Sequence, residues 1–195
     1  MNPIISVSRC HGFSLIELMI AMVIGLILLA GVGTVFISTQ QTLQTKRALD
    51  NAQEALRYAH QSISRIVKSG EINDASDANR LVITFNRSAV TPDCLGGDLD
   101  AEVEVVYSLN PNDELECSVD GGASGILSRN ITGFDLQYKK LGTAADDWTG
   151  INDKDAVSVR VNLTFSDPTD RVLIDTSFVA TSRQSVIDGH FASSQ

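Results

Sequence analysis

The sequence has little proline and few cysteines, and each shortage excludes some structures and some kinds of site. Proline occurs only 4 times in 195 residues. No proline lies between Pro3 and Pro92, so nothing in that stretch prevents a long uninterrupted helix. The chain has 3 cysteines, Cys10, Cys94 and Cys117. Their wide separation excludes a CxxC redox pair, and no Cys/His set has the spacing of a zinc site.

Basic charge and catalytic motifs are also scarce. The 15 Lys and Arg residues are outnumbered by 24 Asp and Glu residues, which gives a net charge of -9. This balance argues against direct nucleic-acid binding and against a polybasic lipid-binding patch. GxSxG, HExxH, P-loop and GxGxxG patterns are absent. His60 and His190 stand apart from any Ser or Cys nucleophile pattern. We therefore expect no catalytic residues, no cofactor and no enzymatic activity.

What the chain does have is a long apolar run near its start. From Phe13 to Ile37 the only formal charge is Glu17. The run is too long and too apolar for the core helix of a soluble domain. A secretory signal peptide cut near Thr34 is one alternative. A retained transmembrane helix is the other, since a helix of this length spans about 37 Å. In that helix a carboxylate costs about 2–3 kcal/mol or more, so Glu17 needs a functional reason or an interfacial position.

The stretch HGFSLIELMIAM resembles the class III signal sequence of type IV pilins and of type II secretion pseudopilins. The resemblance implies a leader ending at Gly12, cleavage by prepilin peptidase before Phe13, and N-methylation of the new Phe13 amine. It also implies an assembly role for Glu17. In the filament core this carboxylate would pair with the N-terminal amine of a neighbouring subunit, because two charges that are costly alone become tolerable together.

A second, amphipathic stretch follows the apolar run. Apolar residues recur there at alternating steps of three and four, at Leu49, Ala52, Leu56, Ala59, Ile63 and Ile66. This spacing predicts one apolar face on a helix. Gly70 is suited to end it, because Arg65 and Lys68 precede it in the last turn. We predict one continuous helix from about Ser14 to Ser69. A membrane-proximal coiled coil is the alternative, and the shortness of the apolar stripe disfavours it.

From Asn79 onward the sequence is typical of strands. Segments that alternate in polarity or are rich in β-branched residues cover 80–85, 101–109, 114–119, 133–140, 156–165 and 172–182. The segment Ser166-Asp167-Pro168-Thr169-Asp170-Arg171 predicts the turn of an antiparallel hairpin. The predicted fold class is α+β, with a long N-terminal helix packed on an antiparallel β-sheet head. This is also the architecture that the resemblance to pilins implies.

Cys94 and Cys117 enclose a loop of about two dozen residues. A disulfide there would contribute roughly 3–4 kcal/mol in the chain-entropy account. Export past the inner membrane favours oxidation. The alternative is a pair of free buried thiols.

The head also contains an oxygen-rich stretch. We expect no metal, but Asp147, Asn152, Asp153 and Asp155 are weak calcium candidates, since some pseudopilins bind calcium in such loops. EF-hand spacing is not matched, and ordinary turn chemistry explains these residues equally well. The neighbouring Trp148 is the single tryptophan. It either contacts a partner subunit or covers the sheet edge.

The resemblance is closest to minor pilins of the PilW kind, through the run QEALRYAHQSISRIVKSGEI and the closing FVATSRQ. It implies a minor pilin that primes or caps a type IV pilus, which serves attachment, twitching or DNA uptake. We expect four parts: a leader (1–12), a transmembrane and filament-core half-helix (13–37), an amphipathic half-helix (38–70) and a periplasmic head (71–195).

Implied partners are prepilin peptidase, other minor and major pilins, an inner-membrane platform protein and the membrane. The expected location is the inner membrane as a single-pass protein, and the pilus fibre after assembly. A minor pseudopilin of type II secretion shares the same helix, Glu17 and head. A membrane-anchored periplasmic enzyme or ligand-binding module with an uncut leader is the alternative of another class.

Overall fold

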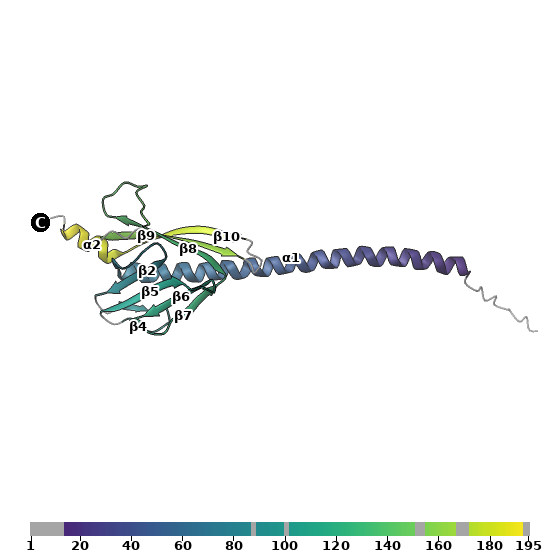
Figure 1. Cartoon of the computed structure of the whole chain (residues 1–195), viewed down its shortest axis with the longest axis horizontal. Helices are drawn as coiled ribbons and strands as arrows, with labels where there is room; N and C mark the ends of the chain where they lie inside the picture. The colour runs from purple at the N-terminus through teal and green to yellow at the C-terminus, as the bar shows by residue number, and fades with distance from the viewer. Residues whose placement is uncertain (1–13, 87–88, 100–101, 151–154, 167–171, 193–195) are drawn as a thin grey trace, which may run out of the picture. The chain divides into compact units, whose positions relative to one another are not determined.

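The computed structural model describes residues 14–86, 89–99, 102–150, 155–166 and 172–192 (Figure 1). Its first element, α1, runs Leu15–Ser69, which confirms the predicted uninterrupted helix. The chain divides into two compact units, Met1–Lys46 and Arg47–Gln195. The first unit contains the apolar part of α1. The second contains the remainder of α1 and all the strands.

The strands of the second unit form three antiparallel sheets. The five-stranded sheet has the order β1 (Glu71–Ile72), β2 (Arg80–Phe85), β5 (Val103–Leu109), β6 (Glu114–Val119) and β7 (Gly125–Arg129). The three-stranded sheet has the order β10 (Val172–Thr181), β9 (Ala156–Ser166) and β8 (Ile131–Lys140). A small ribbon pairs β3 (Ala89–Pro92) with β4 (Asp98–Leu99). The sequence suggested one sheet, and the structure instead divides the strands.

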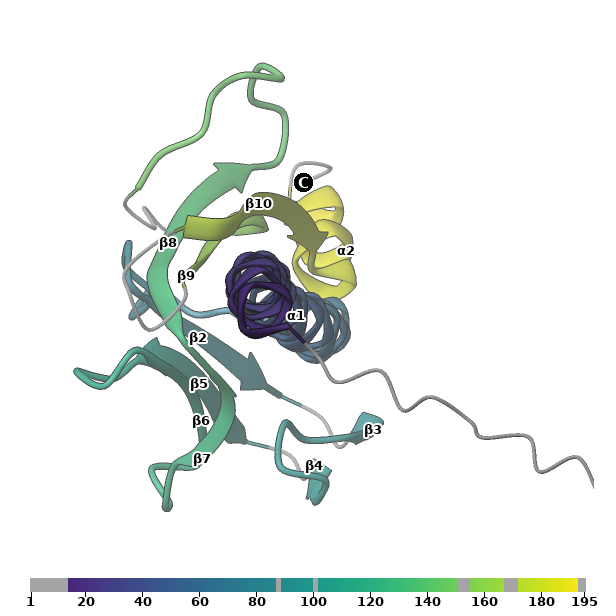
Figure 2. The same cartoon turned by 90° about the vertical axis from the view of Figure 1, so that its right-hand side faces the viewer.

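The second unit is layered around the last part of α1. Figure 2 shows this part of the helix between the five-stranded sheet on one side and the three-stranded sheet with α2 (Arg183–Ala192) on the other. The buried apolar residues of the helix and of both sheets belong to one core. The predicted stripe supplies the helix side of this core. Ala59, Ile63 and Ile66 have no exposed surface, whereas Leu49 and Leu56 are only partly buried.

Strand β9 is the centre of the three-stranded sheet and shows why the alternation predicted a strand. Val159, Val161 and Leu163 are fully buried, while Arg160 and Asn162 between them point to the other face and are partly exposed. Successive side chains in a strand point to opposite faces, so one face joins the core. The antiparallel pairing of β9 with β10 is confirmed. Of the turn between them, residues 167–171 lie outside the described part.

The two large sheets are tied to each other by hydrogen bonds through loops. The Tyr138 hydroxyl donates to the Asp77 carbonyl at 2.7 Å, and the Leu136 amide donates to the Ala78 carbonyl at 2.8 Å. Both bonds link β8 to the loop that precedes β2. They satisfy backbone groups where the sheet ladders stop, so the division into two sheets leaves these groups paired.

Candidate functional site

The start of α1 carries the first group of candidate residues. The amides of Glu17 and Leu18 both donate to the Ser14 carbonyl, at 3.0 and 3.2 Å. Ser14 therefore stands at the N-cap and Glu17 lies in the first turn. The spacing Ser-x-x-Glu is that of a capping box, which the sequence reasoning did not use. A carboxylate at this end is favoured by the helix dipole. Gly12 and Phe13, the predicted cleavage and methylation site, lie outside the described residues.

The apolar part of α1 buries nothing within the chain. The helix contains an apolar stretch long enough to cross a membrane, and none of the residues in that stretch is buried. Every Leu, Ile, Met, Val and Phe between Leu15 and Ile37 is more than half exposed. This excludes the reading of the segment as a core helix of this domain. An apolar surface of this length requires hydrocarbon or other helices to cover it.

The hydroxyls that follow this surface are satisfied by the helix itself. The Thr34 hydroxyl donates to the Gly31 carbonyl at 2.8 Å, and the Thr39 hydroxyl donates to the Val35 carbonyl at 2.8 Å. Thr42 and Thr45 make the same kind of bond. A hydroxyl that bonds to its own helix is less costly in an apolar environment. The polar residues at the end of the run are thus compatible with an apolar surrounding.

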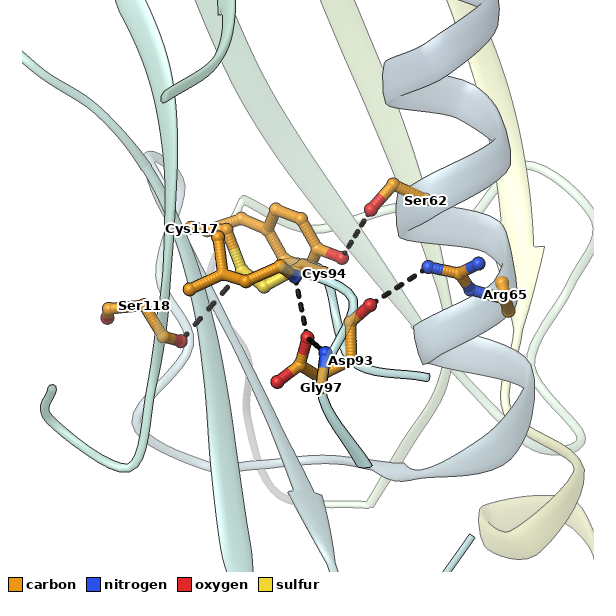
Figure 3. The surroundings of a disulfide bond; sticks show 9 residues. Ser62, Arg65, Asp93, Cys94, Gly97, Cys117 and Ser118 are labelled. Carbon is orange, nitrogen blue, oxygen red and sulfur yellow. Dashed lines mark hydrogen bonds between the residues drawn. A yellow bond between two sulfur atoms is a disulfide. The ribbon is translucent and has the colours of Figure 1, made fainter. Parts of the chain in front are cut away.

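In the head, the structure joins Cys94 and Cys117 in a disulfide with a Cα–Cα distance of 6.4 Å (Figure 3). Both cysteines are buried, with 2% and 0% exposure. The carboxylate of Asp93 accepts from the amides of Leu95 and Gly97 at 2.7 and 2.8 Å. Arg65 on α1 donates to the Asp93 carbonyl at 3.0 Å. The disulfide and this bond together fasten the loop between β3 and β4 to β6 and to α1.

Trp148 lies in the loop that follows β8. The Arg160 guanidinium carbon is 4.2 Å from the centre of its ring, and the Lys139 Nζ is 5.7 Å away. Thr149 forms a backbone bridge with Tyr138, with N–O distances of 2.7 and 3.0 Å in the two directions. Because β8 is an edge strand, this bridge covers part of its edge. The sequence analysis singled out Trp148 but neither of the two cations.

The calcium candidates are only partly placed. Asp147 and Asp155 are both exposed, and Asn152 and Asp153 lie outside the described residues. Among the residues that the structure describes, no group of three or more His, Cys, Asp or Glu side chains could hold a metal ion.

The histidines stand apart from these groups. The His60 ring meets Phe178 edge-on at 4.5 Å between centroids. The two rings line a shallow groove of about 270 Å³ between α1 and β10. His190 lies in α2, a helix that the sequence analysis did not predict.

Comparison with known proteins gives one family match. The model described as "Prokaryotic N-terminal methylation motif" matches residues 7–33. No curated protein and no solved structure matches the chain. The motif, followed by a long helix and antiparallel sheets, defines a type IV pilin-like protein with a class III signal. The motif supports a type IV pilin or a pseudopilin. The motif indicates a structural subunit rather than an enzyme, processed by prepilin peptidase and assembled with other pilins.

Proposed function

We propose that this chain is a minor pilin that primes or caps the assembly of a type IV pilus. One combined observation carries the proposal. The methylation motif at 7–33 overlaps an apolar half-helix that has no buried residue in its membrane-length stretch and has Glu17 in its first turn. In a lone subunit this surface is covered by the membrane. In a filament it is covered by the same halves of neighbouring helices.

Processing creates the partner that Glu17 needs. Prepilin peptidase cuts between Gly12 and Phe13, removes the leader 1–12 and methylates the Phe13 amine. Glu17 is exposed and forms no ion pair with any described residue. A carboxylate that leaves water for a helix bundle is costly unless a cation meets it. The Phe13 amine of an adjoining subunit meets that need, and only one axial stagger of two helices brings the groups together.

The remaining parts follow from this division. Residues 13–37 form the transmembrane and filament-core half of the helix, and 38–70 form the half that carries the head, 71–195. The subunit waits in the inner membrane as a single-pass protein with a periplasmic head. It engages a platform protein there, then enters the fibre beside other minor and major pilins. Twitching and attachment belong to the whole filament, and the chain contributes to them as one of its subunits.

The minor role and the PilW kind are supported by sequence features. The run QEALRYAHQSISRIVKSGEI and the closing FVATSRQ resemble PilW-like chains, although Gln184 stands where asparagine is common in them. The second candidate is a minor pseudopilin of type II secretion, which the same motif supports. Purification partners distinguish the two candidates. Recovery of the chain in sheared pili supports the minor pilin, whereas recovery only with components of the secretion system supports the pseudopilin.

The first test is the N-terminal sequence and intact mass of the protein purified from its native membrane. We expect a start at Phe13, a mass one methyl group above that of chain 13–195, and a loss of two hydrogens for the disulfide. A start at Met1 would contradict the proposal and favour a plain anchor carrying an enzyme or binding module. A start near Thr34 would equally contradict it, because the helix half and Glu17 would be lost.

The second test concerns Glu17 itself. Glu17→Gln should still insert in the membrane and be processed, but its recovery in sheared filaments should fall at least tenfold, because the neighbour's amine loses its partner. Glu54→Gln is the matched control, since Glu54 is an exposed carboxylate on the same helix within the second unit. Normal recovery of Glu17→Gln would sink the assembly mechanism while leaving the processing result intact.

A further inference from the structure

The outer face of the three-stranded sheet carries a cluster of Trp148, Lys139 and Arg160. Arg160 on β9 lies opposite Gln137 on β8 and opposite Val179 on β10 in the strand register. Cross-strand partners share one face of a sheet. Since Val159 and Val161 face the core, this shared face is the outer one. Trp148 is placed over it by the loop that the Tyr138–Thr149 bridge fixes.

The cluster is rich in donors and lacks a carboxylate. The Arg160 Nη1 donates to the Gln137 side-chain oxygen at 3.2 Å, and the Lys139 Nζ donates to the Ala145 carbonyl at 3.4 Å. In the described part of the chain, no carboxylate forms an ion pair with either cation. A guanidinium has five N–H donors and an ammonium three, so most of their capacity is open.

The nearby acidic residues that the structure describes form no ion pair with either cation. Asp135 shares the outer face but lies opposite Asn162 rather than Arg160. Asp146 and Asp147 precede the tryptophan and are exposed. In a chain with a net charge of -9, Lys139 and Arg160 place two positive charges side by side around one tryptophan ring. Their charge is complementary to an external carboxylate rather than to the remainder of this surface.

The residue types also suit a protein partner. Trp and Arg are the side chains most enriched among residues that dominate binding energy at protein interfaces. Here they are stacked and partly buried, so little side-chain freedom remains to be lost on binding. Val179, half-exposed at 50%, adds an apolar contact beside them. Free guanidinium donors and the Trp148 ring N–H would bind a carboxylate, while the ring and Val179 contact the apolar part of the partner.

We propose that this cluster is the docking site on the head for an acidic segment of a neighbouring filament subunit. The inference rests on the proposed function, because it takes the partner from the assembled filament. It goes further by naming the face, the residues and the charge of the partner segment.

The test in the filament places a photoreactive amino acid at position 179, which leaves the three cluster residues intact. Irradiated filaments should yield an adduct with a second subunit at a peptide that contains Asp or Glu. Position 126 is the matched control, since Ile126 is 47% exposed but lies on the five-stranded sheet. The variant K139Q/R160Q should lower the adduct from position 179 at least tenfold, while incorporation into filaments is retained. An undiminished adduct, or none from a subunit present in filaments, would overturn the proposal.

A direct measurement separates this inference from the assembly role. Trp148 is the single tryptophan, so the fluorescence of the full chain in detergent reports on the cluster. A Glu-rich peptide should change it saturably, a Gln-matched peptide should not, and R160Q should weaken the apparent affinity about tenfold. R160K retains the positive charge but loses the planar guanidinium that can make two parallel hydrogen bonds. Its affinity for the peptide should lie between those of the unmodified chain and R160Q. Response to a uronic-acid oligosaccharide but not to the peptide would overturn the proposal, as would no response to either. Absence of the chain from filaments, with peptide binding intact, would instead count against the proposed function.

Discussion

Ser62 on α1 and Tyr107 on β5 share a buried hydrogen bond, with 3.0 Å between their hydroxyl oxygens. Ser62 is 3% exposed and Tyr107 is fully buried. The bond is a polar contact between the helix and the five-stranded sheet, within an otherwise apolar core (Figure 3 shows Ser62 beside the disulfide). Burial raises the pKa of the Tyr107 hydroxyl well above its usual range, and the bond to Ser62 opposes that rise.

This bond predicts the behaviour of a mutant cycle. Tyr107→Phe leaves the Ser62 hydroxyl buried without its partner and should lower the free energy of unfolding by about 1–3 kcal/mol. Ser62→Ala should have a similar cost, because Tyr107 is then the unpaired group. The double variant should be less destabilised than the sum of the two, since no orphaned hydroxyl remains. Urea unfolding of the full chain in detergent, followed by Trp148 fluorescence, measures all four proteins. Strict additivity would show that the bond contributes no coupling.

The two buried tyrosines predict a loss of stability at high pH. Burial raises the pKa of both Tyr107 and Tyr138 in the folded state. Above about pH 10 the unfolded state releases these protons and the folded state retains them, so the free energy of unfolding falls. The slope should approach about 1.4 kcal/mol per pH unit for each tyrosine. Unfolding free energies from pH 8 to 11.5 test this. Tyr138→Phe should reduce the slope, whereas Tyr58→Phe, at a half-exposed position, is the control.

A side chain at Gly70 should clash with the neighbouring strand at the end of α1. A Cβ built there would meet Ile83 Cγ2 at 2.5 Å and the Thr84 carbonyl oxygen at 3.0 Å. Gly70→Ala should therefore destabilise the head by about 1–3 kcal/mol through overpacking against β2. Gly150→Ala is the matched control, because a Cβ at Gly150 meets nothing within 4 Å. Thermal unfolding of the two variants gives the comparison, and equal melting temperatures would show that β2 shifts without cost.

Removal of the disulfide should lower the stability of the head by an amount set by the length of the loop that it closes. Cys94 and Cys117 are separated by 23 positions, so replacing both by Ala should lower the free energy of unfolding by about 3 kcal/mol. The loop of Asp93 should then exchange its amide hydrogens faster, beginning with Gly97, whose amide donates to the Asp93 carboxylate. Urea unfolding and hydrogen exchange measure the two effects. Unchanged exchange at Gly97 would show that the Arg65 bond alone holds the loop.

Loss of the Ser182 hydroxyl should destabilise the start of α2. Its hydroxyl is fully buried, donates to the Gly70 carbonyl at 2.6 Å and accepts from the Ser185 amide at 3.1 Å. Ser182→Ala removes both the N-cap of α2 and its link to the end of α1, and should cost about 1–2 kcal/mol. Faster hydrogen exchange of the Ser185 amide would confirm it. Ser177→Ala, at an exposed position in β10, should leave that exchange unchanged.

The strongly periodic elements were predictable from the sequence. The helix, the strand at 114–119 and the strand at 80–85 have the predicted bounds within a residue. The strands at 125–129 and 71–72 were missed, because they are short and owe their pairing to β6 and β2. The helix α2 was missed because it contains a glycine, lacks an apolar stripe and is capped by Ser182, whose hydroxyl is fixed by the distant Gly70 carbonyl.

By itself, the sequence determined where the chain is apolar, where Glu17 interrupts that surface, and which residues of the long helix face a core. Those properties depend on local periodicity and on hydrophobicity, which need no knowledge of distant residues. Only the tertiary structure decided that the strands divide into two large sheets around α1. It also decided that Gly70 is required for space beside Ile83, and that Lys139, Trp148 and Arg160 meet on one face. Each of these depends on contacts between residues far apart along the chain, which no local pattern encodes.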